Sequence, residues 1–268
     1  MKIIYDLGAN NGDDIPYYLL RADKVVAVEA NPALCNKIEQ KFAKEISEER
    51  LAVVASVVTT AKEHRESVKF YLHRSNHVLS QFPKPDDLQD FDEVNLPSTS
   101  LKELFDQYGL PYYLKIDIEN YDQEILRELF ALDVFPVYLS AESHEPAVIA
   151  EMILAQKYTG FKLVEGFSVA RKYKDMDVDG VSVSLTHHSA GPFGEDIEGP
   201  WFSKTDFLML LGIEGMGWKD IHATTNSNPK DFIESEKILF LYRKILVRTC
   251  WFMLRRMNLF YKRIFRRK

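Results

Sequence analysis

The sequence predicts an α/β fold in which a mostly parallel sheet carries helices on both faces. Short apolar segments that suit strands alternate with segments that suit helices over about residues 3–165. A turn with glycines at residues 8 and 12 follows the first expected strand and opens the first expected helix. A chain of 268 residues, 46% hydrophobic and 28% charged, can bury a full core, so the alternation is that of an ordinary globular domain.

In the first half of the chain, the expected strands are short apolar runs separated by helical segments. The polar residues 74–95, which include Pro83 and Pro85, predict a long loop. The expected strands are residues 3–5, 25–28, 51–58 and 68–72, and the expected helices are residues 13–20 and 32–46.

In the second half, Ser98, Thr99 and Ser100 are typical N-cap residues and predict a helix that begins at Leu101. Residues 186–235 contain six glycines and three prolines, which predicts an irregular segment over the sheet edge or the mouth of the site. The expected helices are residues 101–108, 122–130 and 147–156, and the expected strands are residues 112–118, 137–141, 161–164 and 181–185.

Charge divides the chain into an expected domain, residues 1–235, and a basic tail, residues 236–268. Residues 237–268 hold eleven Lys or Arg and no acid, so the net charge of −6 combines +11 in the tail with −17 in residues 1–236. Cys35 and Cys250 form neither a disulfide framework nor a zinc site, which suits a reducing compartment. No apolar run reaches the ~18 residues of a membrane-spanning helix, and the first one is too short for a signal peptide. We therefore expect a cytoplasmic protein.

The turn after the first strand predicts a nucleotide-like cofactor. Its glycines are spaced G-x-x-x-G, whereas a dinucleotide site requires G-x-G-x-x-G. Asp6 precedes Gly8, and a carboxylate there would repel a pyrophosphate but would suit the ammonium group of S-adenosylmethionine (SAM). Glu29 ends the second strand 23 positions after Asp6, an offset typical of an acid that binds ribose hydroxyls. An ordinary strand-to-helix turn is the alternative for Gly8 and Gly12 alone.

Four sequence blocks resemble the FkbM family of SAM-dependent methyltransferases. They are DLGANNG (6–12), VEANP (28–32), STSL (98–101) with LKIDIE (114–119), and AESH (141–144). The resemblance covers about residues 3–165 and implies a Rossmann-like class I methyltransferase fold. It also implies O-methylation, often of hydroxyls of sugars, glycans or related metabolites.

Within these blocks, Asn10 and Asn31 join Asp6, Gly8, Gly12 and Glu29 as expected SAM-binding residues. Ser56, late in the third strand, could reach the adenine, although a plain strand position is the simpler interpretation. Two positions depart from the family pattern. Asn120 replaces a glycine and Asp122 replaces a longer acid. Asn tolerates the left-handed backbone, so the turn can survive.

Polar groups at the ends of two later strands predict the catalytic site. Asp117 and Glu119 follow one strand, and Glu142 and His144 follow the next with the same spacing. Ligands bind at this edge of a parallel sheet. The four groups could act as general acids and bases, with Asp117 and His144 activating the acceptor hydroxyl, or they could hold Mg²⁺. Glu119 and Glu142 could instead cap helices or orient Lys115.

On a helix, residues 238–265 gather most basic side chains on one face and most apolar side chains on the other. Such a helix suits a membrane surface with anionic lipids, which would make the protein peripheral on the inner face of a membrane. Docking on a protein is the alternative. The dense Trp, Phe and Tyr content disfavours nucleic acid.

The sequence as a whole therefore predicts a SAM-dependent O-methyltransferase that acts on a small-molecule or glycan acceptor. A non-catalytic scaffold with the same fold, tethered by its tail, is the alternative from another class. A nucleotide-dependent oxidoreductase is disfavoured because G-x-G-x-x-G is missing.

Overall fold

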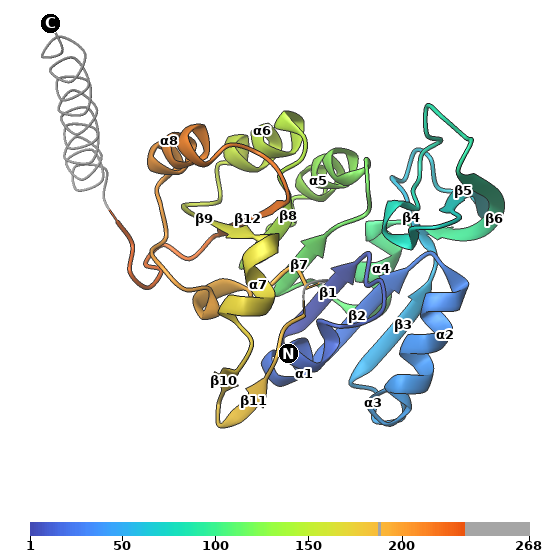
Figure 1. Cartoon of the computed structure of the whole chain (residues 1–268), viewed down its shortest axis with the longest axis horizontal. Helices are drawn as coiled ribbons and strands as arrows, with labels where there is room; N and C mark the ends of the chain where they lie inside the picture. Colours follow the sequence, from blue (N-terminus) through green and yellow to red (C-terminus); the bar gives the residue numbers. More distant parts are fainter. Residues whose placement is uncertain (187–188, 234–268) are drawn as a thin grey trace, which may run out of the picture.

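A seven-stranded sheet organises the computed structural model, which describes residues 1–186 and 189–233 (Figure 1). Its strands are β1 (Ile3–Leu7), β2 (Lys24–Glu29), β3 (Leu51–Ala55), β7 (Tyr113–Ile116), β8 (Tyr138–Glu142), β9 (Gly160–Glu165) and β12 (Lys219–Thr224). Their order is β3-β2-β1-β7-β8-β12-β9. The first five of these strands are parallel, and β12 runs antiparallel to both β8 and β9. The tail expected at residues 236–268 lies outside the described residues.

Helices cover both faces of the sheet, which confirms the expected fold class (Figure 1). Successive side chains of β1 point to opposite faces, so Tyr5 joins one core cluster and Ile4 the other. The helices are α1 (Ile15–Arg21), α2 (Pro32–Lys41), α3 (Ala43–Ser47), α4 (Leu101–Tyr108), α5 (Asp122–Ala131), α6 (Pro146–Leu154), α7 (Gly166–Lys172) and α8 (Lys204–Glu214). The first cluster includes side chains of α4, α5, α6 and α8, and the second includes side chains of α1, α2 and α7.

Ser100 caps α4, as its sequence predicts. The Ser100 hydroxyl accepts a hydrogen bond from the Glu103 N–H at 3.3 Å, and the Glu103 carboxylate accepts one from the Ser100 N–H at 2.9 Å. This reciprocal pair satisfies two backbone donors that a helix start leaves free. None of the helices in residues 1–186 and 189–233 is long and apolar enough to cross a membrane.

The prediction for residues 186–235 was wrong in part, because this segment contains α8 and the interior strand β12. β12 reads Lys-Asp-Ile-His-Ala-Thr and lacks the apolar run of a core strand, yet all six residues are buried. Its neighbours β8 and β9 are distant in sequence, and their pairing overrides the weak local preference. Residues 181–185 do not extend the sheet either. β10 (Met176–Val178) and β11 (Val181–Val183) form a separate hairpin.

A second, three-stranded sheet lies at one end of the molecule (Figure 1). It contains β4 (Val57–Val58), β5 (Ser67–His73) and β6 (Phe91–Thr99) in the order β4-β6-β5. The loop expected at residues 74–95 is therefore shorter, because its last five residues pair with β5. The expected strand 51–58 is interrupted at Ser56, and the expected helix 32–46 is interrupted at Phe42.

Candidate active site

A cavity of about 430 Å³ opens at the carboxyl ends of β1, β2, β7 and β8. One group of lining residues belongs to the ends of these strands, and a second group belongs to the three-stranded sheet and its 74–90 connection. Trp218 also lines the cavity. Of the residues predicted from the sequence, the lining includes Gly8, Asn10, Glu29, Ser56, Asp117, Glu119, Glu142 and His144. The topology thus brings together groups that are up to 136 positions apart in the chain.

The turn after β1 requires glycine for reasons of space. Gly8 has φ +86°, and a Cβ there would lie 1.8 Å from the Asp117 carbonyl oxygen. Asn10 also adopts the left-handed backbone, at φ 49°. Its Oδ1 is buried and has no hydrogen-bond partner among the described residues, although Asn10 lines the cavity. A ligand that donates a hydrogen bond would satisfy this oxygen.

Glu29 ends β2 with both carboxylate oxygens held by backbone amides. Oε2 accepts a hydrogen bond from the Asn10 N–H at 2.8 Å, and Oε1 accepts one from the Asn31 N–H at 2.7 Å. Burial raises the pKa of Glu29 to about 7. Each oxygen keeps a further lone pair, so this fixed carboxylate can still accept hydrogen bonds from a ligand.

Three predicted cofactor residues, Asp6, Gly12 and Asn31, are not among the residues that line the cavity. The Asp6 carboxylate is buried against Lys115. Gly12, at φ +73°, leaves room for the apolar side chains of Ile15 on α1 and Ile38 on α2. The Asn31 side chain caps α2 by accepting a hydrogen bond from the Ala33 N–H at 3.0 Å. These are roles in the fold, and their proposed contact with a cofactor stays a prediction.

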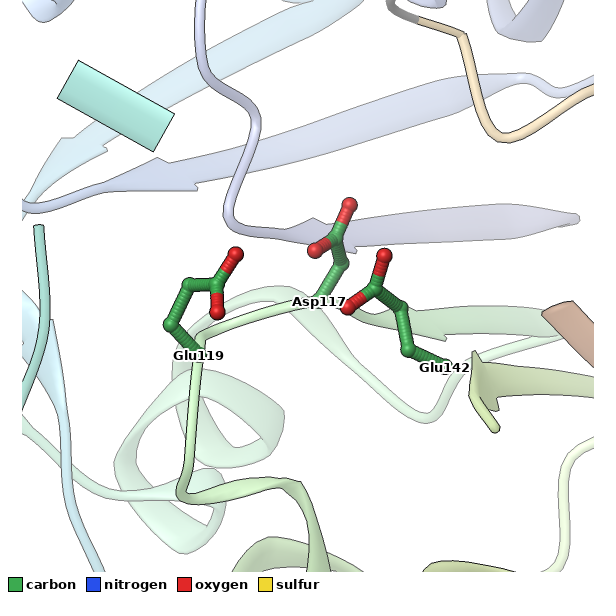
Figure 2. Close-up of side chains that lie close together, drawn as sticks. All are labelled: Asp117, Glu119 and Glu142. Atoms are coloured by element: carbon green, nitrogen blue, oxygen red, sulfur yellow. The ribbon is translucent and has the colours of Figure 1, made fainter. Parts of the chain in front are cut away.

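Three carboxylates meet at the other end of the cavity. Oxygens of Asp117, Glu119 and Glu142 lie within 4.8 Å of one another, and Figure 2 shows the three side chains turned toward the same space. His144 Nδ1 lies 3.0 Å from Glu142 Oε2. A cluster of this kind can take up a proton, bind a cation or accept hydrogen bonds from hydroxyl groups.

The turn that presents Glu119 has an unusual backbone. Glu119 and Asn120 follow one another with φ of 46° and 60°, in the left-handed region. Two such non-glycine residues in succession are costly and persist only where the surroundings hold them. Asn120 is held by its side-chain amide, which donates a hydrogen bond to Gln81 Oε1 at 2.7 Å. The turn therefore survives without glycine, as expected, and the connection between β5 and β6 helps to hold it through Gln81.

Lys115 is the buried cation beneath this cluster. Its Nζ lies 3.2 Å from Asp6 Oδ1 and 3.1 Å from Asp117 Oδ2, and its side chain is 5% exposed. Asp6 and Lys115 are register partners on adjacent parallel strands, so their side chains share a face. Lys115 thus connects the end of β1 to the end of β7 and orients Asp117.

Burial, and then repulsion between neighbouring carboxylates, raise the pKa values of three acids near Lys115: Glu119, Glu142 and Asp220. Burial first, and then the charges of Asp117 and Asp220, raise the pKa of Glu142 to about 10. Burial and Asp117 raise the pKa of Glu119 to about 7. Asp220, on β12 opposite Glu142, is buried and its pKa is also raised by burial and by Asp117. Glu142 therefore holds a proton at neutral pH and would release it when a cation binds.

Two features of the site were not predicted from the sequence. Trp218 and Asp220 belong to the segment expected to be irregular, and only the pairing of β12 with β8 brings them to the site. Phe70 and Phe82 line the cavity from the three-stranded sheet and its connection, and Phe82 packs edge-on against Tyr121 at 5.0 Å. The apolar alternation of β5 was visible in the sequence, but its place over the cavity was not.

The chain matches the model of the methyltransferase FkbM domain over residues 6–163, more than half of its length. None of the curated proteins matches the sequence.

Matches among solved structures include an FkbM methyltransferase from Methylobacillus flagellatus, 11% identical over 61% of this chain and 40% of its own, with a TM-score of 0.40. A spermidine synthase from Thermotoga maritima is 11% identical over 87% of this chain and 56% of its own, with a TM-score of 0.35. A SAM-dependent methyltransferase from Aquifex aeolicus is 14% identical over 61% of this chain and 76% of its own, with a TM-score of 0.29. The chain spans less than two thirds of the first two structures.

Proposed function

The chain belongs to the FkbM methyltransferase family, and from this we propose that it transfers a methyl group from SAM to a hydroxyl group of a sugar, glycan or related metabolite. The observation that carries the proposal is that one cavity is lined by Gly8 and Glu29 at one end and by Asp117 and Glu142 at the other. The carbonyl of Asp117 also packs directly against Gly8, so the two ends are fixed relative to one another.

The residues at the first end fit SAM. Asn10 Oδ1, which accepts no hydrogen bond within residues 1–186 and 189–233, suits the ammonium group. The carboxylate of Glu29, held by two backbone amides, suits the ribose hydroxyls. Ser56 and the apolar side chains of Leu34, Val57 and Phe70 line the part of the cavity that we assign to the adenine. When bound, SAM supplies a methyl group on a positively charged sulfur.

At the second end, the chain has to align the acceptor hydroxyl and remove its proton. We assign the general base to Asp117, because its carboxylate faces the cavity and Lys115 holds it at 3.1 Å. The pair of Glu142 and His144, 3.0 Å apart, lies beside it and can pass the proton to solvent, since the His144 side chain is 48% exposed.

A divalent cation is the alternative way to activate the hydroxyl. Asp117, Glu119 and Glu142 are the residues that would hold Mg²⁺, and the ion would lower the pKa of the acceptor hydroxyl. We favour Asp117 acting alone, because Lys115 already pairs with its carboxylate at 3.1 Å.

Calorimetric titration with SAM tests the cofactor half. We expect wild type to bind, Glu29→Gln to bind at least tenfold more weakly, and the exposed Glu165→Gln to match wild type. No binding by wild type would refute the methyltransferase proposal.

Transfer of labelled methyl groups to a set of glycosides and hydroxylated metabolites tests the acceptor half. Asp117→Asn is expected to lower kcat by about 10²–10⁴-fold while SAM still binds. SAM binding without transfer to any acceptor by wild type would favour the alternative function, a non-catalytic scaffold.

We further propose that the protein works in the cytoplasm, at the inner face of a membrane, through residues 237–268. Support comes from the sequence alone, in which eleven basic residues are interleaved with apolar ones. Flotation of the full chain with vesicles that contain anionic lipid should be lost when Arg255, Arg256, Lys262 and Arg263 are changed to Gln. Equal flotation of both proteins would refute the proposal.

A further inference from the structure

The side of the cavity next to the carboxylates is formed by an aromatic surface to which the proposed mechanism gives no role. Trp218 lines the cavity together with Glu142 and His144. The Trp218 ring meets the Phe167 ring edge-on, with centroids 4.7 Å apart and an interplanar angle of 84°. Phe167 is 79% exposed, so the aromatic surface continues from the cavity to the solvent.

Hydrogen bonds on both sides of Trp218 hold it in place. Its carbonyl accepts a hydrogen bond from the Gly166 N–H at 3.0 Å. The preceding Gly217 carbonyl accepts one from the Ser143 hydroxyl at 3.2 Å. The following residue, Lys219, is buried and its ammonium donates to the Glu214 and Gly215 carbonyls at 2.7 and 3.0 Å. The loop that carries the indole is therefore tied to β8, α7 and the end of α8.

Gly166 shows that the indole position is built into the fold. A Cβ at residue 166 would lie 2.6 Å from the indole ring, so only glycine leaves room for Trp218 at this place. An exposed phenyl ring contributes little to the core, and together with the half-buried indole it forms a continuous aromatic surface that reaches the solvent. The pair thus offers a preformed apolar face, which lowers the entropic cost of binding a rigid ligand.

The carboxylates beside this face indicate what it binds. Glu119, Glu142 and His144 offer polar groups within the same cavity that can form hydrogen bonds with hydroxyl groups. A ring with an apolar face and hydroxyl groups on its edge would satisfy both surfaces at once, whereas an acyl chain would leave these polar groups unused. Both Trp218 and Phe167 lie beyond residues 6–163, the part of the chain that matches the family model.

We propose that Trp218 and Phe167 form the acceptor subsite, where they hold the apolar face of a sugar ring or of an aromatic ring and so place its hydroxyl beside Asp117. Trp218 is then a specificity-determining residue of this chain. The inference rests on the proposed methyl transfer, since it assigns the acceptor of that reaction.

The test uses the full chain saturated with S-adenosylhomocysteine and two ring probes, methyl β-D-glucopyranoside and phenol, with 1-hexanol as a probe without a ring. Binding is measured by ligand-observed NMR titration. We expect one or both ring probes to bind wild type better than hexanol. Trp218→Ala should weaken that binding by about tenfold, in the range of aromatic stacking. Trp218→Phe should restore most of it, and Phe167→Ala should have a smaller effect. Leu154→Ala removes another exposed apolar side chain, 73% exposed on α6, and should change nothing.

The outcomes separate this inference from the function on which it rests. Failure of wild type to bind S-adenosylhomocysteine would refute the methyltransferase proposal itself. Binding of S-adenosylhomocysteine with no preference for either ring probe would overturn only the acceptor subsite. Loss of S-adenosylhomocysteine affinity in Trp218→Ala, with the ring probe unaffected, would move Trp218 to the cofactor wall and would also overturn it. The affinity for methyl β-D-glucopyranoside, compared with the affinity for phenol, identifies whether the subsite holds a sugar ring or an aromatic ring.

Discussion

Replacing Asp122 by Asn should change how the stability of the protein depends on pH. Asp122 begins α5, is 7% exposed, and its Oδ1 accepts a hydrogen bond from the Ile118 N–H at 3.1 Å. Burial first, and then the charge of Asp117, raise its pKa from 3.8 to about 7. The folded state thus holds a proton on Asp122 at a pH where the unfolded chain has lost it. Its contribution to stability is complete below the unfolded pKa and is lost as pH rises through about 7.

The expected magnitude follows from these values. Between pH 5 and its folded pKa of about 7, titration of this one carboxyl lowers the free energy of unfolding by about 3 kcal/mol, at ~1.4 kcal/mol per pH unit. Above pH 7 the loss levels off. The Asn side chain cannot ionise, but its oxygen can still accept the Ile118 hydrogen bond. Asp122→Asn should therefore gain about 3 kcal/mol over wild type between pH 5 and pH 9.

Urea denaturation of both proteins at intervals from pH 5 to pH 9 measures this difference directly. Asp175→Asn, at an exposed position, is the matched control and should follow wild type throughout. A free-energy difference between Asp122→Asn and wild type that stays constant over this range would refute the reasoning.

Three further predictions follow from the site. Gly8→Ala should lose several kcal/mol of stability, because its Cβ would meet the Asp117 carbonyl at 1.8 Å. Gly180→Ala, at the same φ of +86° with open space around it, should lose only about 1 kcal/mol in urea denaturation, and equal losses would contradict the prediction. Lys115→Met should lower the free energy of unfolding by about 3–5 kcal/mol, because it leaves the buried Asp6 carboxylate unpaired. The double variant Lys115→Met with Asp6→Asn should regain part of that free energy in urea denaturation. No recovery would argue against the ion pair. Methyl transfer should be unchanged by EDTA if Asp117 alone is the base, and a loss restored by Mg²⁺ would assign the role to a metal ion.

Much of the fold could be predicted because the local signals were strong. The alternation of apolar runs and helical segments determined the parallel half of the sheet, and Ser100 marked the start of α4. Neighbouring parallel strands end at the same edge of a sheet, and this rule predicted that four side chains would lie close together: Asp117, Glu119, Glu142 and His144.

The remainder depended on partners that are distant in the chain. β12 carries Lys219, Asp220 and His222, and its polar sequence becomes a strand only between β8 and β9. The contact between Asp6 and Lys115 could not be predicted either, because it depends on the pairing of β1 with β7, and the two residues are 109 positions apart in the chain. The sequence predicted that Asp6 would bind a positive charge, and the structure places the ammonium of Lys115 3.2 Å from its carboxylate.

The position of β12 has a consequence for how the protein is made. The five parallel strands from β3 to β8 are complete once residue 142 has left the ribosome, and chains fold from the N-terminus as they emerge. β9 pairs with β12 and with no other strand of the described residues, so it has no partner in the sheet until residue 224 is synthesised. During that interval the edge of β8 is open, and an open strand edge is a place where chaperones or other chains can pair. The half of the sheet that carries Gly8, Glu29 and Asp117 can therefore assemble first, and the segment that carries Trp218 is added later.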